Sequence, residues 1–505
     1  MRTLLTFGIV MCSALPARAG DTRLADAAQQ QRWDTVRALI AERAPVNERQ
    51  ADGATALAWA AHWSHLDGAS ALLRAGADPN LVNDLGVSPL GLAAKNGSLP
   101  MTSLLLKGNA DPNVKTVSGE TPLMTASFTG SVDVVKTLVA HGADVNAATT
   151  GSQQTALMWA VSERHPQVVK VLAEVGAKVD AKSAGGFTPL LFAARQGDAT
   201  SAAALLDAGA SIDLVGRDRN TPLIVAIASV REEVAQLLIA RGANPNADAA
   251  GFGPLHAAIS RNLPEVVKAL LISGAQPNAR LKSAPGSVFG SNRGAGSEVI
   301  SVSAQELEAG VAGSVGARTV AATFTGATPF WLAARSVNVP IMEALLAAGA
   351  DPSLTIENGT TPLMAAAGLL QTQGNRSKRL EAVQFSAAWN ESDSADAVRF
   401  LVAHGADINA VNTSAQTALH CAAYMGANPV VQFLIDKGAA IDARDAQGQT
   451  PFRIAEAHLN VAGQGITDWP RTAALLRSLG ADTTLGVDGR TMLRIYPKSD
   501  EAADR

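Results

Sequence analysis

This chain of 505 residues is poor in cysteine and in aromatic residues. It has two cysteines, and aromatic residues make up 4% of its length although hydrophobic residues make up 47%. Cys12 lies in an amino-terminal apolar run, which leaves Cys421 without an intramolecular disulfide partner once that run is removed. A core with so few rings must be built from alanine, leucine and valine, which favours many closely packed helices over one large central core.

Beyond its amino terminus the sequence also lacks a long hydrophobic run. No later stretch approaches the roughly 20 apolar residues that a membrane-spanning helix needs. The first residues instead have the pattern of a secretory signal peptide, with Arg2, a short apolar run from Leu4 to Ala14, and small residues at Ala17 and Ala19. We therefore expect a signal peptide over residues 1–19, cleavage after Ala19, and a periplasmic or secreted protein.

The chain has no excess of positive charge. Its formal charge of -4 becomes -6 when Arg2 and Arg18 are removed with the expected signal peptide. Binding to the phosphate backbone of nucleic acids rewards clustered lysine and arginine. A nucleic-acid partner is therefore not expected.

Motifs of enzymes and metal sites are missing as well. The sequence has no Gly-x-Ser-x-Gly, no phosphate-binding glycine-rich loop ending in Lys-Ser/Thr, and no His-Glu-x-x-His. His62 and His65 have a spacing that could share a metal ion, but no third ligand accompanies them. Cys421 follows His420 in an apolar stretch and is expected to be a buried, inert thiol. We expect no catalytic residue, no cofactor and no metal site.

One string of residues recurs through most of the chain. Residues 119–147 read "GETPLMTASFTGSVDVVKTLVAHGADVNA", and near copies follow at steps that are mostly 33 residues long. With the polar variant around Leu24 included, the series predicts about twelve units. The residue at the leucine position is Leu24, Leu57, Leu90, Leu123, Leu157, Leu190, Leu223, Leu255, Phe330, Leu363, Leu419 and Phe452.

Each part of the unit has a physical reason. Thr121 is suited to the N-cap of a short helix, and Pro122 to its first position, where the missing N–H costs nothing. A second helix follows with apolar residues at helical spacing, and Gly142 is expected to end it in a left-handed conformation. One such unit cannot cover its own apolar face, so neighbouring units must stack.

With these motifs in order, the sequence resembles an ankyrin repeat protein of the exported bacterial type. The resemblance implies an all-α solenoid of about twelve helix-turn-helix units with hairpin-like loops, over residues 20–483, followed by a variable tail at 484–505. It also implies that His256 and His420, which follow the motif leucine, tie their helix to the loop.

Two insertions interrupt the repeat. Residues 282–323 extend a hairpin loop and are expected to be flexible; they are either a tolerated insertion or a binding loop that reaches over the concave side. Residues 368–392 lie between the two helices of the tenth unit, where a packing role is expected.

In the family, a partner usually contacts the concave groove, which is lined by the loop tips before Thr-Pro and by the two positions after Ala-Ala. Aromatic residues and arginine at such positions are typical interface anchors, although packing against an adjacent repeat is an equally simple explanation for any one of them. Trp59, Trp159 and Phe192 lie one step deeper and are assigned to the core. The candidate partner-binding residues are His62, Trp63, Phe128, Phe187, Arg195, Arg217, Arg219, Phe252, Arg335 and Tyr424.

Three functions follow from these patterns. The first is a monomeric, non-enzymatic module that binds another protein through the concave groove. The second is a structural or protective periplasmic scaffold that supports an envelope or redox enzyme. The third is an enzyme with residues 282–323 as a lid, but that segment has no histidine or cysteine, and its glutamates have no evident partner.

Overall fold

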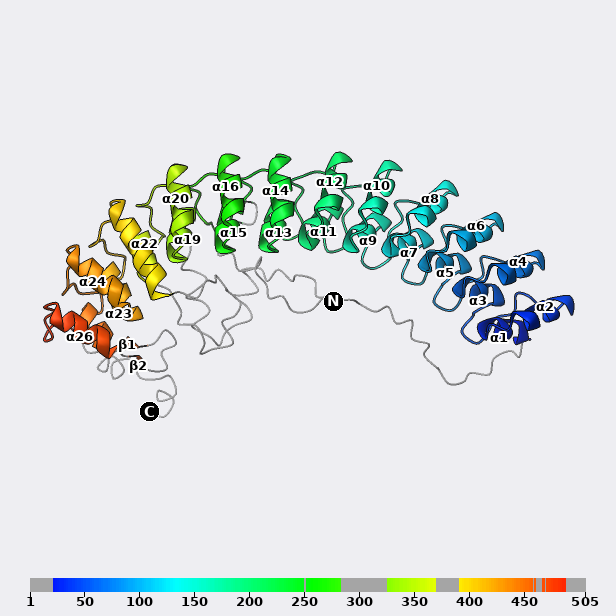
Figure 1. The fold of residues 1–505 in the computed structure, drawn as a ribbon, viewed down its shortest axis with the longest axis horizontal. Coiled ribbons are helices and arrows are strands. Elements are labelled where there is room, and N and C mark those ends of the chain that lie inside the picture. Colours follow the sequence, from blue (N-terminus) through cyan, green and yellow to red (C-terminus); the bar gives the residue numbers. More distant parts are fainter. Residues whose placement is uncertain are drawn as a thin grey trace, which may run out of the picture. The chain divides into compact units, whose positions relative to one another are not determined.

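The structure is a computed structural model of the whole chain. It describes residues 21–248, 251–282, 325–368, 390–456, 458–459, 466–467 and 469–486. The chain divides into two compact units, residues 1–238 and 239–505, which we call the N-terminal unit and the C-terminal unit. Both are built from pairs of antiparallel helices, each pair followed by a hairpin loop (Figure 1).

Each pair has a first helix, which follows the hairpin, and a second helix. In the N-terminal unit the first helices are α1 (Arg23–Gln29), α3 (Ala56–His62), α5 (Pro89–Lys95), α7 (Pro122–Thr129), α9 (Ala156–Ser162), α11 (Pro189–Gln196) and α13 (Pro222–Ala228). The second helices are α2 (Trp33–Ala41), α4 (Leu66–Arg74), α6 (Leu99–Lys107), α8 (Val132–Ala140), α10 (Pro166–Glu174), α12 (Ala199–Asp207) and α14 (Glu232–Ala240), which spans the boundary between the units.

The C-terminal unit continues the same pattern. Its first helices are α15 (Pro254–Ser260), α19 (Pro329–Arg335), α21 (Pro362–Ala366), α23 (Ala418–Met425) and α25 (Pro451–Glu456). Its second helices are α16 (Pro264–Ile272), α20 (Val339–Ala347), α22 (Glu391–Ala403), α24 (Asn428–Asp436) and α26 (Pro470–Ser478). The described residues thus contain twelve helix pairs, which confirms the predicted helical repeat fold.

The first helices begin where the Thr-Pro motif predicts. The Thr121 hydroxyl accepts a hydrogen bond from the Met124 amide at 3.3 Å, with Pro122 at the first helical position. Such a cap contributes about 1 kcal/mol to helix stability. The same cap is present at Thr55, Ser88, Thr155, Thr188, Thr221, Thr328, Thr361 and Thr417.

The second helices end as predicted, at glycines in the left-handed region. Gly142, for example, has a φ of 87° and nothing within 4 Å of the position that a Cβ would occupy. It is therefore backbone conformation, and not crowding, that favours glycine there. The other predicted glycines, Gly76, Gly209, Gly242, Gly349, Gly405 and Gly438, share this conformation, as do Gly176, Gly274 and Gly480. After α2 and α6 the left-handed residue is Arg43 and Asn109 instead.

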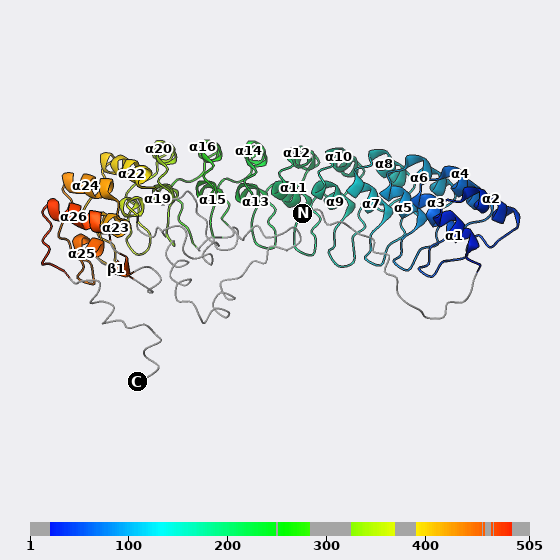
Figure 2. The ribbon, with the colours of Figure 1, turned by 60° about the horizontal axis from the view of Figure 1, so that its bottom comes forward.

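The core of each unit lies between its two rows of helices (Figure 2). In the fourth pair, Leu123 of α7 packs with Val134, Val135 and Leu138 of α8, and all four are almost completely buried. Full burial of one such side chain contributes about 1.5–3 kcal/mol. First helices also contact first helices of the adjacent pairs, and second helices contact second helices, so each pair completes the core of its neighbours.

An asparagine in seven of the described loops joins neighbouring pairs. The Asn113 side chain donates a hydrogen bond to the Gly142 carbonyl at 2.9 Å and accepts one from the Asp144 amide at 2.7 Å. We call this recurring pair of bonds the asparagine ladder. Its other members are Asn47, Asn80, Asn146, Asn278 and Asn409, with Asn246 bonded to Gly274 and Gln276 in the same way.

The C-terminal unit contains the interruptions. Leu281 and Ala327 are paired, since the Leu281 amide donates to the Ala327 carbonyl at 2.9 Å. The expected insertion 282–323 lies outside the described residues, except for Lys282. The same holds for the expected signal peptide, for most of the insertion 368–392, and for the tail after residue 486.

Two features of this unit depart from the regular repeat. Helix α21 has five residues and α22 has thirteen, whereas the other second helices have nine. Between α25 and α26, β1 (His458–Leu459) pairs antiparallel with β2 (Ile466–Thr467), so the last pair contains a small strand pair that the all-α prediction did not include. Helix α26 completes the last pair.

Candidate functional site

The exposed sides of α3, α5, α7, α9, α11 and α13, together with the hairpins that lead into them, form what we call the first-helix face of the N-terminal unit. Because successive first helices pack side by side, residues at equivalent repeat positions form rows across this face. The position two residues after the motif leucine is half-buried in each pair. We call its residues the central row: Trp59, Leu92, Thr125, Trp159, Phe192 and Val225.

The central row corrects one prediction. Trp59, Trp159 and Phe192 were assigned to the core, but all three are only half-buried. In the N-terminal unit this position is half-buried whatever residue fills it, as Leu92, Thr125 and Val225 show, so its place in the repeat keeps these rings from being enclosed. These three rings therefore lie partly open at the floor of the first-helix face.

Three aromatic side chains of α3 and its C-cap form the first cluster on this face. The His62 ring makes edge contacts with Trp59 at 5.5 Å and with Trp63 at 4.7 Å between ring centroids. The Trp59 indole donates a hydrogen bond to the Gln50 side chain at 2.6 Å, and this bond fixes the ring against the hairpin. Trp63 is 42% exposed. Partial burial, and then the positive charge of Lys95, lower the pKa of His62.

Phe128 and Trp159 form the second cluster, where α7 meets α9. Their rings pack edge to face with centroids 5.8 Å apart. The Trp159 indole donates to the Gln154 side chain at 3.1 Å, again from a hairpin residue, and Phe128 remains 37% exposed. Two glutamine side chains thus satisfy the two tryptophan N–H groups and leave the apolar parts of the rings available.

A third cluster surrounds Phe187, at the hairpin that leads into α11. Its ring centroid lies 5.4 Å from that of Phe192, and the Arg195 guanidinium lies 5.9 Å from the Phe187 centroid. Arg217 and Arg219 are exposed on the next hairpin. The structure thus brings four of the predicted residues, Phe187, Arg195, Arg217 and Arg219, to one end of the first-helix face.

The prediction that Phe252 is an exposed contact is wrong. Phe252 is only 2% exposed. It lies directly before the N-cap position of its helix, at the base of the hairpin and not at its tip. Ala54, Val87 and Asn220 hold the same position in other pairs and are buried as well.

The two remaining candidates lie in the C-terminal unit and are half-buried. Tyr424 is at the end of α23, and its carbonyl accepts a hydrogen bond from the Trp469 indole at 2.9 Å. Burial of the Arg335 guanidinium lowers its pKa to about 10. Neither belongs to a face of exposed rings like that of the N-terminal unit.

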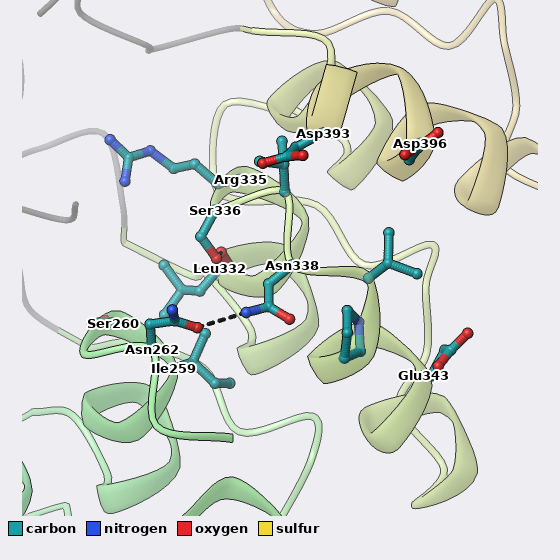
Figure 3. Close-up of a pocket in the computed structure, with 13 residues that line it drawn as sticks. Ile259, Ser260, Asn262, Leu332, Arg335, Ser336, Asn338, Glu343, Asp393 and Asp396 are labelled. Carbon is teal, nitrogen blue, oxygen red and sulfur yellow. Dashed lines mark hydrogen bonds between the residues drawn. The ribbon is translucent and has the colours of Figure 1, made fainter. Parts of the chain in front are cut away.

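Arg335 belongs to a pocket of about 600 Å³ on the inter-helix turns of α15, α19 and α20 (Figure 3). The Asn338 side chain donates to Asn262 at 2.6 Å across it. The first turns of α22 contribute Asp393 and Asp396, so the extra length of that helix forms one wall. Asp396 already pairs with Arg399 at 2.6 Å. The pocket was not predicted, because its wall depends on where α22 begins.

The histidines next to the motif leucine act as predicted. His256 accepts a hydrogen bond from the Gly253 amide at 3.2 Å and contacts the Ala279 carbonyl at 3.0 Å. His420 likewise contacts the Gln449 carbonyl at 3.2 Å. Each ring therefore links its helix to the following hairpin. Burial lowers the pKa of His256 to about 4 and also lowers the pKa of His420.

The remaining chemically reactive groups have structural contacts. His65 caps α4 by accepting from the Gly68 amide at 2.9 Å, and it stacks on Trp33. Cys421 is buried as predicted, and burial raises the pKa of its thiol.

Within the described ranges there is no group of three or more His, Cys, Asp or Glu side chains that could hold a metal ion. In the same residues, no helix has the length and apolarity of a membrane span.

Family models match most of the chain. The model for ankyrin repeats in three copies matches residues 4–83, 69–149, 148–216, 190–280 and 384–463. The model for a single ankyrin repeat matches residues 325–356. A solved structure of the human ASB11 ankyrin repeat domain is 29% identical, with a TM-score of 0.40, over 44% of this chain and 98% of that domain.

Curated proteins of varied kinds share part of the sequence. The nuclear factor NF-kappa-B p105 subunit of Gallus gallus is 36% identical over 173 residues, which are 31% of this chain and 16% of that protein. Serine/threonine-protein kinase 12 of Arabidopsis thaliana is 38% identical over 14% of this chain and 16% of its own length. A transient receptor potential cation channel subfamily A member 1 homolog of Caenorhabditis elegans is 33% identical over 26% and 9%. The matches therefore span a sixth or less of each of these relatives.

Proposed function

Because this chain belongs to the ankyrin repeat family, we propose that it binds another protein through the first-helix face of its N-terminal unit. Ankyrin repeats generally mediate protein–protein interaction, and the family is typically non-enzymatic. The observation that carries the proposal is the row of partly exposed rings on one face, from Trp59 and Trp63 through Phe128 and Trp159 to Phe187.

These rings have the properties of interface anchors. Aromatic side chains contribute large apolar area at low conformational cost, and they dominate measured binding energies at interfaces. Trp59 and Trp159 are already held by glutamine hydrogen bonds. A partner would therefore meet a rigid surface and lose little side-chain entropy on binding.

Site-specific photocrosslinking in the native host tests the proposal. A photoreactive residue at position 63, 128 or 195 is expected to capture a discrete protein partner. Matched positions 66 and 175 are control sites, because Leu66 and Val175 are similarly exposed but lie at ends of the second helices α4 and α10. Equal capture at the control sites, or none at the three face positions, would contradict the proposed interface.

Substitution of the same residues separates this role from that of a scaffold without one tight partner. Trp63→Ala together with Phe128→Ala is expected to weaken partner capture at least about tenfold, the change produced by loss of an interface hot spot. The helical circular dichroism should remain unchanged, because both rings are partly exposed. If only the deletion of whole helix pairs abolished function, the scaffold interpretation would be favoured.

We also propose that the protein acts outside the cytoplasm. The support is the signal-peptide pattern of residues 1–19, which lie outside the described residues. Fractionation of the host and sequencing of the mature amino terminus are expected to give a periplasmic or secreted protein that begins at Gly20. A cytoplasmic protein that retains Met1 would overturn this part of the proposal.

A further inference from the structure

The end of the first-helix face nearest α11 differs chemically from the rest of that face. It carries two phenylalanines and three arginines, which we call the Arg–Phe patch: Phe187, Phe192, Arg195, Arg217 and Arg219. Both phenylalanine rings are half-buried and all three guanidinium groups are exposed.

The patch is built by two neighbouring hairpins in close contact. Gly186 has a φ of 78°, and a Cβ placed there would come within 2.9 Å of the Arg217 backbone nitrogen. Only glycine allows the two hairpins to approach so closely. Arg217 thus lies against Gly186, the residue before Phe187, while the Arg195 guanidinium of α11 lies 5.9 Å from the centroid of the Phe187 ring.

The three arginines of the patch, Arg195, Arg217 and Arg219, form no ion pair with any of the residues that the structure describes. The nearest acidic residue in sequence is Asp218. One of its carboxylate oxygens accepts from the Asn220 amide at 3.2 Å, and the other accepts from the Asn220 side chain at 2.8 Å. Both oxygens of the Asp218 carboxylate therefore accept hydrogen bonds within the turn that separates Arg217 from Arg219.

Charge complementarity indicates the chemistry of the ligand. Exposed guanidinium groups that form no ion pair with the described residues favour carboxylates, which arginine binds through paired hydrogen bonds. The two rings between them favour an apolar side chain. The formal charge of the whole chain is -4, so a long polyanion such as nucleic acid would be repelled by the rest of the surface, whereas a short acidic segment would not.

We infer that the Arg–Phe patch binds an acidic segment of a partner protein, with an apolar side chain placed on Phe187 and Phe192 and carboxylates on the arginines. This inference rests on the proposed function, since it assigns the chemistry of the segment that the first-helix face recognises.

Fluorescence anisotropy with defined peptide probes on the full chain tests the inference. The acidic probe is a labelled peptide of about ten residues, which spans about 33 Å when extended, with two phenylalanines among glutamates and aspartates. The neutral probe replaces each acid by glutamine or asparagine. The acidic probe is expected to bind at least about tenfold more tightly than the neutral one, with an affinity that falls as salt is added.

Paired substitutions locate the binding site. The double variant Arg195→Ala, Arg217→Ala is expected to weaken binding of the acidic probe about tenfold or more. The matched control Lys136→Ala, Lys170→Ala removes two exposed positive charges from the second helices α8 and α10 and should leave binding unchanged. All four side chains are exposed, so both double variants should fold.

Three results would overturn the inference: equal binding of the acidic and neutral probes, equal weakening by the control variant, or preferential binding of an oligothymidylate of similar length. None of these results bears on the proposed function itself. If position 63 or 128 captures a partner in the native host while the peptide results are negative, the binding face stands and only its acidic ligand is rejected.

Discussion

The two units use their large aromatic rings in opposite ways. On the first-helix face of the N-terminal unit, Trp63 and Phe128 are exposed and Trp159 is half-buried. In the C-terminal unit, Phe330 and Trp331 are completely buried. The rings differ in repeat position: Phe330 and Trp331 lie at the motif-leucine position and the one after it, which are buried, whereas Trp159 lies one position further and Trp63 and Phe128 lie at the ends of their helices.

The position after the motif leucine shows what the difference achieves. In the N-terminal unit it is filled by residues such as Ala58, Met124 and Met158, which make no side-chain hydrogen bond there. In the C-terminal unit Trp331 fills the same position, and its indole donates to the Thr360 carbonyl at 3.0 Å, much as His256 and His420 contact their hairpins. At this repeat position, only the unit that contains the interruptions has described side chains that hydrogen-bond to the following hairpin.

Replacing buried Trp331 should produce the largest loss of stability. Trp331→Ala leaves a cavity and removes the bond to Thr360, with an expected cost of about 3–5 kcal/mol in the free energy of unfolding. Trp63→Ala, on the exposed face, should cost less than about 1 kcal/mol. Urea denaturation of the full chain measures both. Similar losses for the two variants would show that the contrast between the units is false.

The second prediction concerns pH, because the buried histidines belong to the C-terminal unit. The pKa of His256 is lowered from 6.5 to about 4, so between these values the unfolded chain binds a proton that the folded chain does not. The stabilisation of the folded chain by neutral His256 is complete above pH 6.5 and is lost as the pH falls toward 4. The expected loss is about 1.4 kcal/mol per pH unit and about 3 kcal/mol in total.

A substitution that introduces the residue found in the N-terminal unit isolates the pH effect of His256. His256→Met places there the residue found at the equivalent positions Met124 and Met158, and should remove the contribution of His256 to the pH dependence. The measurement is the free energy of unfolding of both proteins at pH 7.5, 6 and 5. Parallel curves for wild type and variant would refute the assignment, whatever their absolute difference.

The smallest predicted effect tests what the two units share. Asn113→Asp in the N-terminal unit and Asn409→Asp in the C-terminal unit each remove one donor of the asparagine ladder while keeping the size of the side chain. Each should cost about 1 kcal/mol, the net value of one hydrogen bond. The two costs, measured by urea denaturation, should agree. A much larger cost in one unit would mean that the ladder is not equivalent in the two.

Helix boundaries could be predicted because local residues determine them. Thr121 and Pro122 favour the start of a helix and Gly142 favours its end, whatever the rest of the chain does. The direction of a large ring could not be predicted. Trp59 and Trp331 occupy adjacent repeat positions, two residues and one residue after the motif position, and only the structure shows that the first ring is half-buried and the second completely buried.

The start of α22 was missed for a different reason. It lies inside the predicted insertion 368–392, and this start gives the pocket its wall. Asn390 caps the helix by accepting from the Asp393 amide at 2.8 Å, and Glu391 and Asp393 place negative charge in its first turn. An asparagine followed by acidic residues is a recognisable signal for a helix start, but the expected position of the repeat outweighed it.

The ladder bond of Asn278 reaches across 71 residues of sequence to Gly349, yet it is 3.1 Å long, close to the others. The contact between these two neighbouring helix pairs is therefore preserved although many more residues separate them in sequence than in the other pairs. The entropy of closing such a loop grows only with the logarithm of its length, about 0.6 kcal/mol for each doubling. New segments can thus be added at this tip, and later modified, at little thermodynamic cost to the repeats on either side.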